Sequence, residues 1–93
     1  MGDGSALSQM KIYSVHKVPA TPVSPQSCVD VNGEAKGVTR SDQITSITPP
    51  GKLGNLSLNA YPADEGAVIL HFCNPSKFEV LSPAGVYSFL AVH

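Results

Sequence analysis

The chain has 93 residues, of which 14% are charged and 42% are hydrophobic, and its formal net charge at pH 7 is −1. A domain usually takes ~50–250 residues, so this length allows one compact domain and excludes two independent cores. The chain has six basic and seven acidic residues, and the basic ones form no run, which argues against a nucleic-acid partner. No apolar stretch approaches the roughly 20 residues that span a bilayer, so we expect a soluble protein without a membrane partner.

The first residues differ in composition from the rest. Residues 1–9 are small and polar, and Met10 begins the first apolar segment. We interpret residues 1–9 as a cloning scar or a disordered lead, and residues 10–93 as a single domain.

The N-terminal half is typical of an all-β protein, because short alternating segments are separated by prolines and glycines. Alternation over residues 12–17 predicts a first strand. Three prolines between residues 19 and 25 then confine the chain to a sheet edge or an extended arm, since proline has no N–H to donate. Residues 28–31 predict a second strand that ends in a tight reversal at Asn32 and Gly33. Residues 43–48 predict a third strand.

The C-terminal half has a stronger pattern. Residues 55–61 alternate at period two, with Leu56, Leu58 and Ala60 on one face and polar side chains on the other. Residues 62–66 predict a five-residue hairpin loop that leads into a strand at residues 67–73. Residues 86–92 predict the last strand. We therefore expect an antiparallel β-sandwich, jelly-roll-like, of about seven short strands.

The two C-terminal strands carry apolar residues on both faces, whereas each sheet of a lone sandwich has one wet face. No segment has the spacing of an amphipathic helix that could cover the outer face. We infer that further copies of the chain cover it, although a monomer with scattered surface hydrophobic residues is the competing interpretation. The predicted interface consists of Ala67, Ile69, His71, Tyr87, Phe89, Leu90 and Ala91.

Four runs in the C-terminal half carry a resemblance to a known group of proteins. They are SITPPGKLGNL at residues 46–56, AYPADEGAV at residues 60–68, HFCNP at residues 71–75 and SPAGVYSF at residues 82–89. Together they resemble small phage-encoded β proteins of the tail-fibre and virion structural type, over about residues 42–93. The resemblance implies a virion structural or receptor-binding module that forms a homotrimer, and it brings no catalytic signature.

The two cysteines allow three interpretations. His71 and Cys73 lie two residues apart on one strand face, so with Cys28 or another histidine they could contribute to a tetrahedral metal site, although the spacing matches no finger or ribbon. Cys28 and Cys73 could instead form a disulfide that closes a loop of roughly 45 residues. We favour two reduced thiols and expect no metal and no cofactor.

Enzymatic activity is not indicated. The chain has no Gly-x-Ser-x-Gly elbow, and Asp64 and Glu65 are consecutive turn residues that point apart, so they cannot form the facing carboxylate pair of a glycosidase. The alternative function is a small glycan-binding or neutral-ligand-binding domain, because tyrosine rings can stack on sugars and amides can bond hydroxyl groups. Its predicted ligand-binding residues are Asn59, Tyr61, Asn74 and Tyr87, against the simpler interpretation that these tyrosines cap sheet edges.

Overall fold

The computed structural model describes residues 10–92, so the predicted lead at residues 1–9 lies outside the described residues. The described chain is built from strands and contains no helix, and therefore none that could cross a membrane. The eight strands are β1 (Met10–Val18), β2 (Pro22–Val23), β3 (Ser27–Glu34), β4 (Gln43–Thr48), β5 (Ser57–Asp64), β6 (Ala67–Asn74), β7 (Val80–Leu81) and β8 (Gly85–Val92). The all-β prediction is confirmed.

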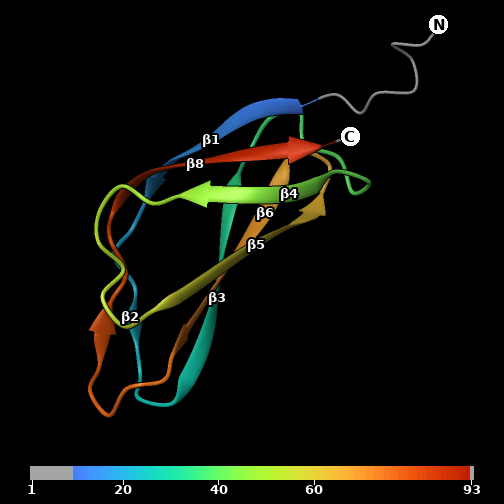
Figure 1. The fold of residues 1–93 in the computed structure, drawn as a ribbon. Coiled ribbons are helices and arrows are strands. Elements are labelled where there is room, and N and C mark those ends of the chain that lie inside the picture. Colours follow the sequence, from blue (N-terminus) through green and yellow to red (C-terminus); the bar gives the residue numbers. More distant parts are fainter. Residues whose placement is uncertain (1–9, 93) are drawn as a thin grey trace, which may run out of the picture.

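The strands form two three-stranded sheets and one two-stranded ribbon, all antiparallel (Figure 1). One sheet has the order β1-β8-β4, and the other has the order β3-β6-β5. The ribbon pairs β2 with β7 at one end of the molecule (Figure 1). The two strands with the most apolar sequences, β6 and β8, are therefore the central strands of the two sheets.

The core lies between the inner faces of these sheets. From β6, Val68, Leu70 and Phe72 are fully buried, and from β8, Tyr87 and Phe89 are buried. Side chains of one sheet pack on those of the other. For example, the rings of Phe72 and Tyr87 meet edge to face with centroids 6.0 Å apart. Each such fully buried side chain contributes about 1.5–3 kcal/mol, so the core depends on the inward positions of these two central strands.

The ribbon is fastened to the rest by polar side chains. The buried Asn74 amide donates to the carbonyl oxygens of Val23 (2.9 Å) and Phe78 (2.7 Å), and its own oxygen accepts from the Ser76 backbone N–H and hydroxyl. The Ser82 hydroxyl accepts from the Thr21 backbone N–H at 2.9 Å. These bonds satisfy buried and partly buried backbone groups next to the short strands β2 and β7.

Two predicted turns are wrong. Asn32 and Gly33 do not reverse the chain, because β3 continues through both of them in register with β6. The loop between β5 and β6 is also shorter than the predicted residues 62–66. Strand β5 continues past Pro62 by way of a bulge, and Glu65 and Gly66 alone form the turn, with Gly66 at a φ of 76°.

Candidate functional site

The outer face of the β3-β6-β5 sheet brings together cysteine, histidine and aspartate side chains, which can react, titrate or bind a metal. Residues directly opposite one another in neighbouring strands share a face, so the register defines rows across the sheet. One row runs Cys28, Cys73, Ser57, and the next runs Asp30, His71, Asn59. The two rows are adjacent, because their members are two residues apart on each strand.

Cys28 and Cys73 are joined by a disulfide, with a S–S distance of 2.08 Å. The prediction of two reduced thiols is therefore wrong. The sequence pattern predicts a strand around each cysteine, but it does not show that β3 and β6 pair. Their register places the two residues opposite each other, with Cα atoms 4.0 Å apart. No free cysteine remains in the described chain.

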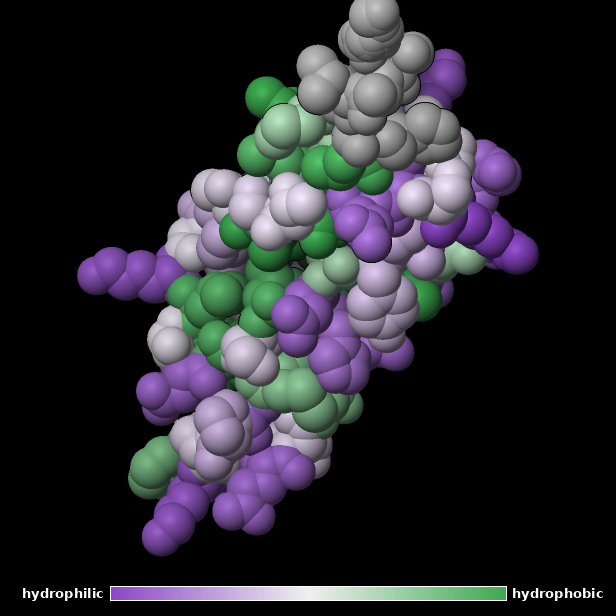
Figure 2. Space-filling model, turned by 45° about the vertical axis from the view of Figure 1, so that its right-hand side comes forward, coloured by the Kyte–Doolittle hydropathy of each residue, from purple (hydrophilic) through white to green (hydrophobic). Residues whose placement is uncertain are grey.

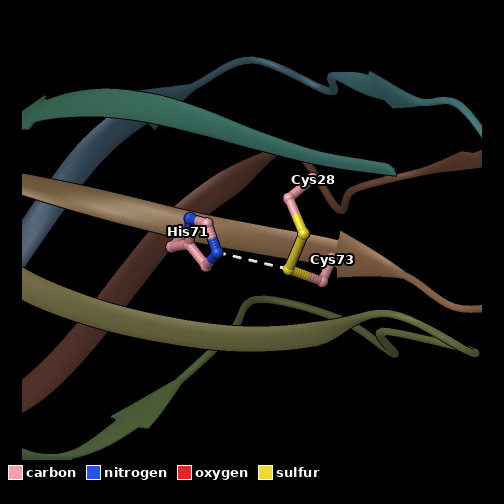
Figure 3. A group of neighbouring side chains, drawn as sticks. All are labelled: Cys28, His71 and Cys73. Carbon is pink, nitrogen blue, oxygen red and sulfur yellow. Dashed lines mark hydrogen bonds between the residues drawn. A yellow bond between two sulfur atoms is a disulfide. The ribbon is translucent and has the colours of Figure 1, made fainter. Parts of the chain in front are cut away.

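His71 links the disulfide to a carboxylate. Its Nδ1 atom lies 2.5 Å from Asp30 Oδ1, and its Nε2 atom lies 3.2 Å from Cys73 Sγ. Figure 3 shows the imidazole beside Cys73, with the disulfide extending from there to Cys28 on β3. The His71 and Asp30 side chains are 32% and 52% exposed, so solvent reaches this group from the outer face.

Asp30 is the member of this candidate site that the sequence analysis missed. The signal is the matched spacing of Cys28 and Asp30 on one strand and of His71 and Cys73 on the other. That signal has meaning only when the two strands are known to pair antiparallel in this register. Without the register, Asp30 is one more polar residue on the outer face of a predicted strand.

The same site contains the metal-ligand set weighed from the sequence. The ligand atoms of Cys28, His71 and Cys73 lie within 4.8 Å of one another. A thiolate, however, is the form of cysteine that binds metal, and in the disulfide each sulfur is bonded to the other. In this oxidised form His71 is the one member of the set with a nitrogen donor to offer, and three ligands are available only after reduction.

The predicted interface residues divide into two groups. Tyr87, Phe89 and Ala91 are at most 2% exposed and fill the core of their own chain, which corrects their assignment to a surface between copies. Their apolar character serves the packing of β8 on the other sheet. The residues on outward faces, all partly exposed, are Ala67, Ile69 and His71 on β6 and Leu90 on β8.

The predicted ligand-binding residues divide in the same way. Asn74 and Tyr87 are buried, and their polar groups already bond to the backbone, Tyr87 by donating its hydroxyl hydrogen to the Pro83 carbonyl at 2.6 Å. They are corrected to structural residues. Asn59 and Tyr61 lie on the outer face of β5, where the Tyr61 ring is 42% exposed and its centroid lies 6.4 Å from that of His71.

An open groove lies beside β1, next to the turn between β5 and β6. Its volume is about 740 Å³, and Lys17, Lys36, Glu34 and Glu65 are among its lining residues. Two cations and two anions around one open groove favour no ligand of either charge. The groove therefore has no set of convergent groups comparable to that at the disulfide.

Comparison with known proteins identifies no relative. No family model, no curated protein and no solved structure matches the chain. The resemblance to phage-encoded β proteins stays a prediction.

Proposed function

We propose that this chain is a non-enzymatic structural module of a virion or of a mobile-element-encoded assembly, folded as a jelly-roll-like β-sandwich and acting as a homo-oligomer. The observation that carries the proposal is the outer face of the β1-β8-β4 sheet. On that face Met10 is 63% exposed and Ile12 is 75% exposed. They lie opposite Val92 and Leu90 of β8, so four apolar side chains adjoin one another.

The rows that contain these four side chains also lack charge, although Ile12 borders the groove that Lys17 and Glu34 line. Three rows cross the sheet there, and none of their members is charged: Met10, Val92 and Gln43; Ile12, Leu90 and Ser46; Ser14, Ser88 and Thr48. Symmetric copies of a chain bring like surfaces together, so an uncharged apolar face can meet a copy of itself without charge repulsion. The outer face of the other sheet has Asp30, Glu34 and His71, which makes it less suited to this contact.

One view of the surface shows an apolar area bordered by polar side chains (Figure 2). Figure 2 shows apolar side chains in a band along the middle of one face, with hydrophilic side chains on both sides and at the lower end. The Cys28–Cys73 disulfide suits an oxidising environment such as a virion surface. The resemblance to phage-encoded β proteins favours an assembly of three copies. It also implies that the assembly attaches to a receptor.

The test is the mass of the protein in solution, measured by light scattering across micromolar concentrations. We expect a multiple of the protomer mass. Leu90→Asp should lower this mass toward that of a single chain, because it places a charge in a dry contact. Asn59→Asp is the matched control, since it introduces the same charge at an exposed position on the outer face of the other sheet, and it should leave the mass unchanged.

Two results would count against the proposal. One is a wild-type protein that stays a monomer at high micromolar concentration. The other is a mass lowered equally by both variants while circular dichroism shows them folded. A response on a glycan array that Tyr61→Ala abolishes would instead support the glycan-binding alternative, which now depends on Asn59 and Tyr61 alone.

A further inference from the structure

We propose that the Cys28–Cys73 disulfide is an exchange site for an external thiol, with Cys28 as the sulfur attacked and Cys73 as the sulfur released beside His71. The reaction partner is a cysteine thiol of a peptide or protein. This inference is independent of the proposed assembly, because the disulfide is on the β3-β6-β5 sheet and the proposed contact is on the other sheet.

Exposure distinguishes the two sulfurs. Cys28 is on a strand at the edge of its sheet and is exposed, whereas Cys73 is on the central strand and is half-buried. Thiol–disulfide exchange depends on which sulfur the attacking thiolate can reach and on how well the other sulfur leaves. Solvent access therefore directs attack to Cys28 and makes Cys73 the leaving group.

The contacts of His71 suit it to assist this departure. Its Nδ1 faces a carboxylate oxygen of Asp30, which accepts hydrogen bonds, and its Nε2 faces a disulfide sulfur, which has only lone pairs. A neutral imidazole has one N–H, so it can donate to one of these acceptors but not to both. The imidazolium form donates to both, and Asp30 compensates its charge.

The step balances as follows. The external thiolate forms a S–S bond with Cys28 Sγ, the Cys28–Cys73 bond breaks, and its electron pair leaves on Cys73 Sγ. The Nε2–H of His71 neutralises that thiolate by hydrogen bonding or by proton transfer, and Nδ1–H remains bonded to Asp30. A second external thiol then attacks the mixed disulfide at the sulfur it gained. This releases the oxidised thiol pair and leaves Cys28 and Cys73 reduced.

The simpler interpretation is a structural disulfide that has a cross-strand ion pair as its neighbour. A half-exposed histidine opposite an aspartate is an ordinary sheet pair, worth at most about 1 kcal/mol. What separates the two interpretations is the direction of Nε2. An ion pair needs Nδ1 alone, whereas here the other nitrogen lies within 3.2 Å of the leaving sulfur.

The first experiment treats the oxidised protein with reduced glutathione at neutral pH and follows the mixed disulfide by intact mass and peptide mapping. We expect the glutathione on Cys28. His71→Gln should slow the reaction about tenfold and spread the adduct over both cysteines, since a positioned proton donor usually contributes at least that factor. Asn32→Ala, an exposed polar residue on the outer face of β3, is the matched control and should react at the wild-type rate.

Asp30 acts as a positioning residue, and its variants test that role. Asp30→Asn should slow the exchange by a smaller factor than His71→Gln, because the imidazole stays but loses its charge partner. Asp30→Glu keeps the carboxylate and should restore most of the rate. A residue that only supported the strand would not give this order of rates.

A second measurement does not depend on the disulfide. In Cys28→Ser the lone Cys73 lies beside His71, and in Cys73→Ser the lone Cys28 is the control. We expect iodoacetamide at neutral pH to alkylate Cys73 faster, despite its lower exposure, and we expect this advantage to vanish when His71→Gln is added.

The proposal is overturned if His71→Gln, shown to be folded by circular dichroism, exchanges at the wild-type rate with the adduct still on Cys28. It is equally overturned if Cys73 in Cys28→Ser is alkylated no faster than Cys28 in Cys73→Ser. Either result would make the disulfide a structural cross-link only.

Discussion

Gly33 and Val15 meet so closely across the two sheets that a β-carbon on Gly33 would lie 2.4 Å from Val15 Cγ1. Gly33 belongs to β3 and Val15 to β1, so this contact sets how near the edges of the two sheets can approach. Glycine is required here for its lack of a side chain, because the buried Val15 fills the space that a methyl group would need.

Gly33→Ala should therefore destabilise the fold by about 1–3 kcal/mol, the usual cost of overpacking a core. Adding Val15→Ala should cost less in the Gly33→Ala protein than in wild type, since the two positions share one space. Denaturant unfolding of the four proteins measures this coupling. Additive free energies of unfolding would contradict the contact.

Loss of the disulfide should lower stability substantially. The cross-link joins residues 45 positions apart, and a loop of that length corresponds to about 4 kcal/mol in the chain-entropy model. Cys28→Ala with Cys73→Ala should show this loss in denaturant unfolding. A wild-type protein kept reduced throughout is the control and should unfold at a similarly low denaturant concentration, whereas unchanged stability in both would exclude the cross-link as a stabilising element.

Asn74 should be the least replaceable polar residue of the described chain. It is 1% exposed and bonds to two backbone carbonyl groups, so Asn74→Ala leaves both without its amide. We expect a loss of about 1–3 kcal/mol, the usual cost of one unsatisfied buried group, because the Phe78 carbonyl keeps the Ser76 hydroxyl as a donor. The exposed Asn59 is the control, and Asn59→Ala should change stability by less than about 0.5 kcal/mol in thermal or denaturant unfolding.

Tyr87 should make the protein sensitive to alkali. Burial raises the pKa of its hydroxyl above the ordinary value of 10.0, and Ser82 opposes this shift with a smaller effect. The folded state thus holds the proton more tightly than the unfolded state, so the stabilisation is complete below about pH 10 and is lost as pH rises through the folded-state pKa. Thermal midpoints measured from pH 8 to pH 11 should fall.

Tyr87→Phe should reduce this alkaline fall and lower stability at neutral pH by about 1 kcal/mol, because the bond to the Pro83 carbonyl is lost. Tyr61→Phe, at an exposed ring, is the control and should keep the wild-type fall. An equal alkaline fall in all three proteins would show that Tyr87 is not its source.

Individual strands could be predicted from local patterns, and where such a prediction is wrong the cause is also local. Residues 43–48 coincide with β4, because β-branched residues alternate there and Pro49 and Pro50 end the run. The predicted turn at Asn32 and Gly33 is wrong, since a glycine that permits a reversal also permits a close approach between sheets. The two apolar faces of β8 differ in burial, because Tyr87 and Phe89 lie in the core and Leu90 faces outward.

The sequence by itself determined the strand periodicity, the proline and glycine boundaries and the absence of a helix pattern, because these depend on neighbours along the chain. Only the tertiary structure decided that Cys28 meets Cys73, that Asp30 meets His71, and which face of each central strand is buried. The physical reason is register. A shift of one residue in a strand pair moves every side chain to the opposite face, and no local pattern in this chain fixes that choice between strands separated by some 40 residues.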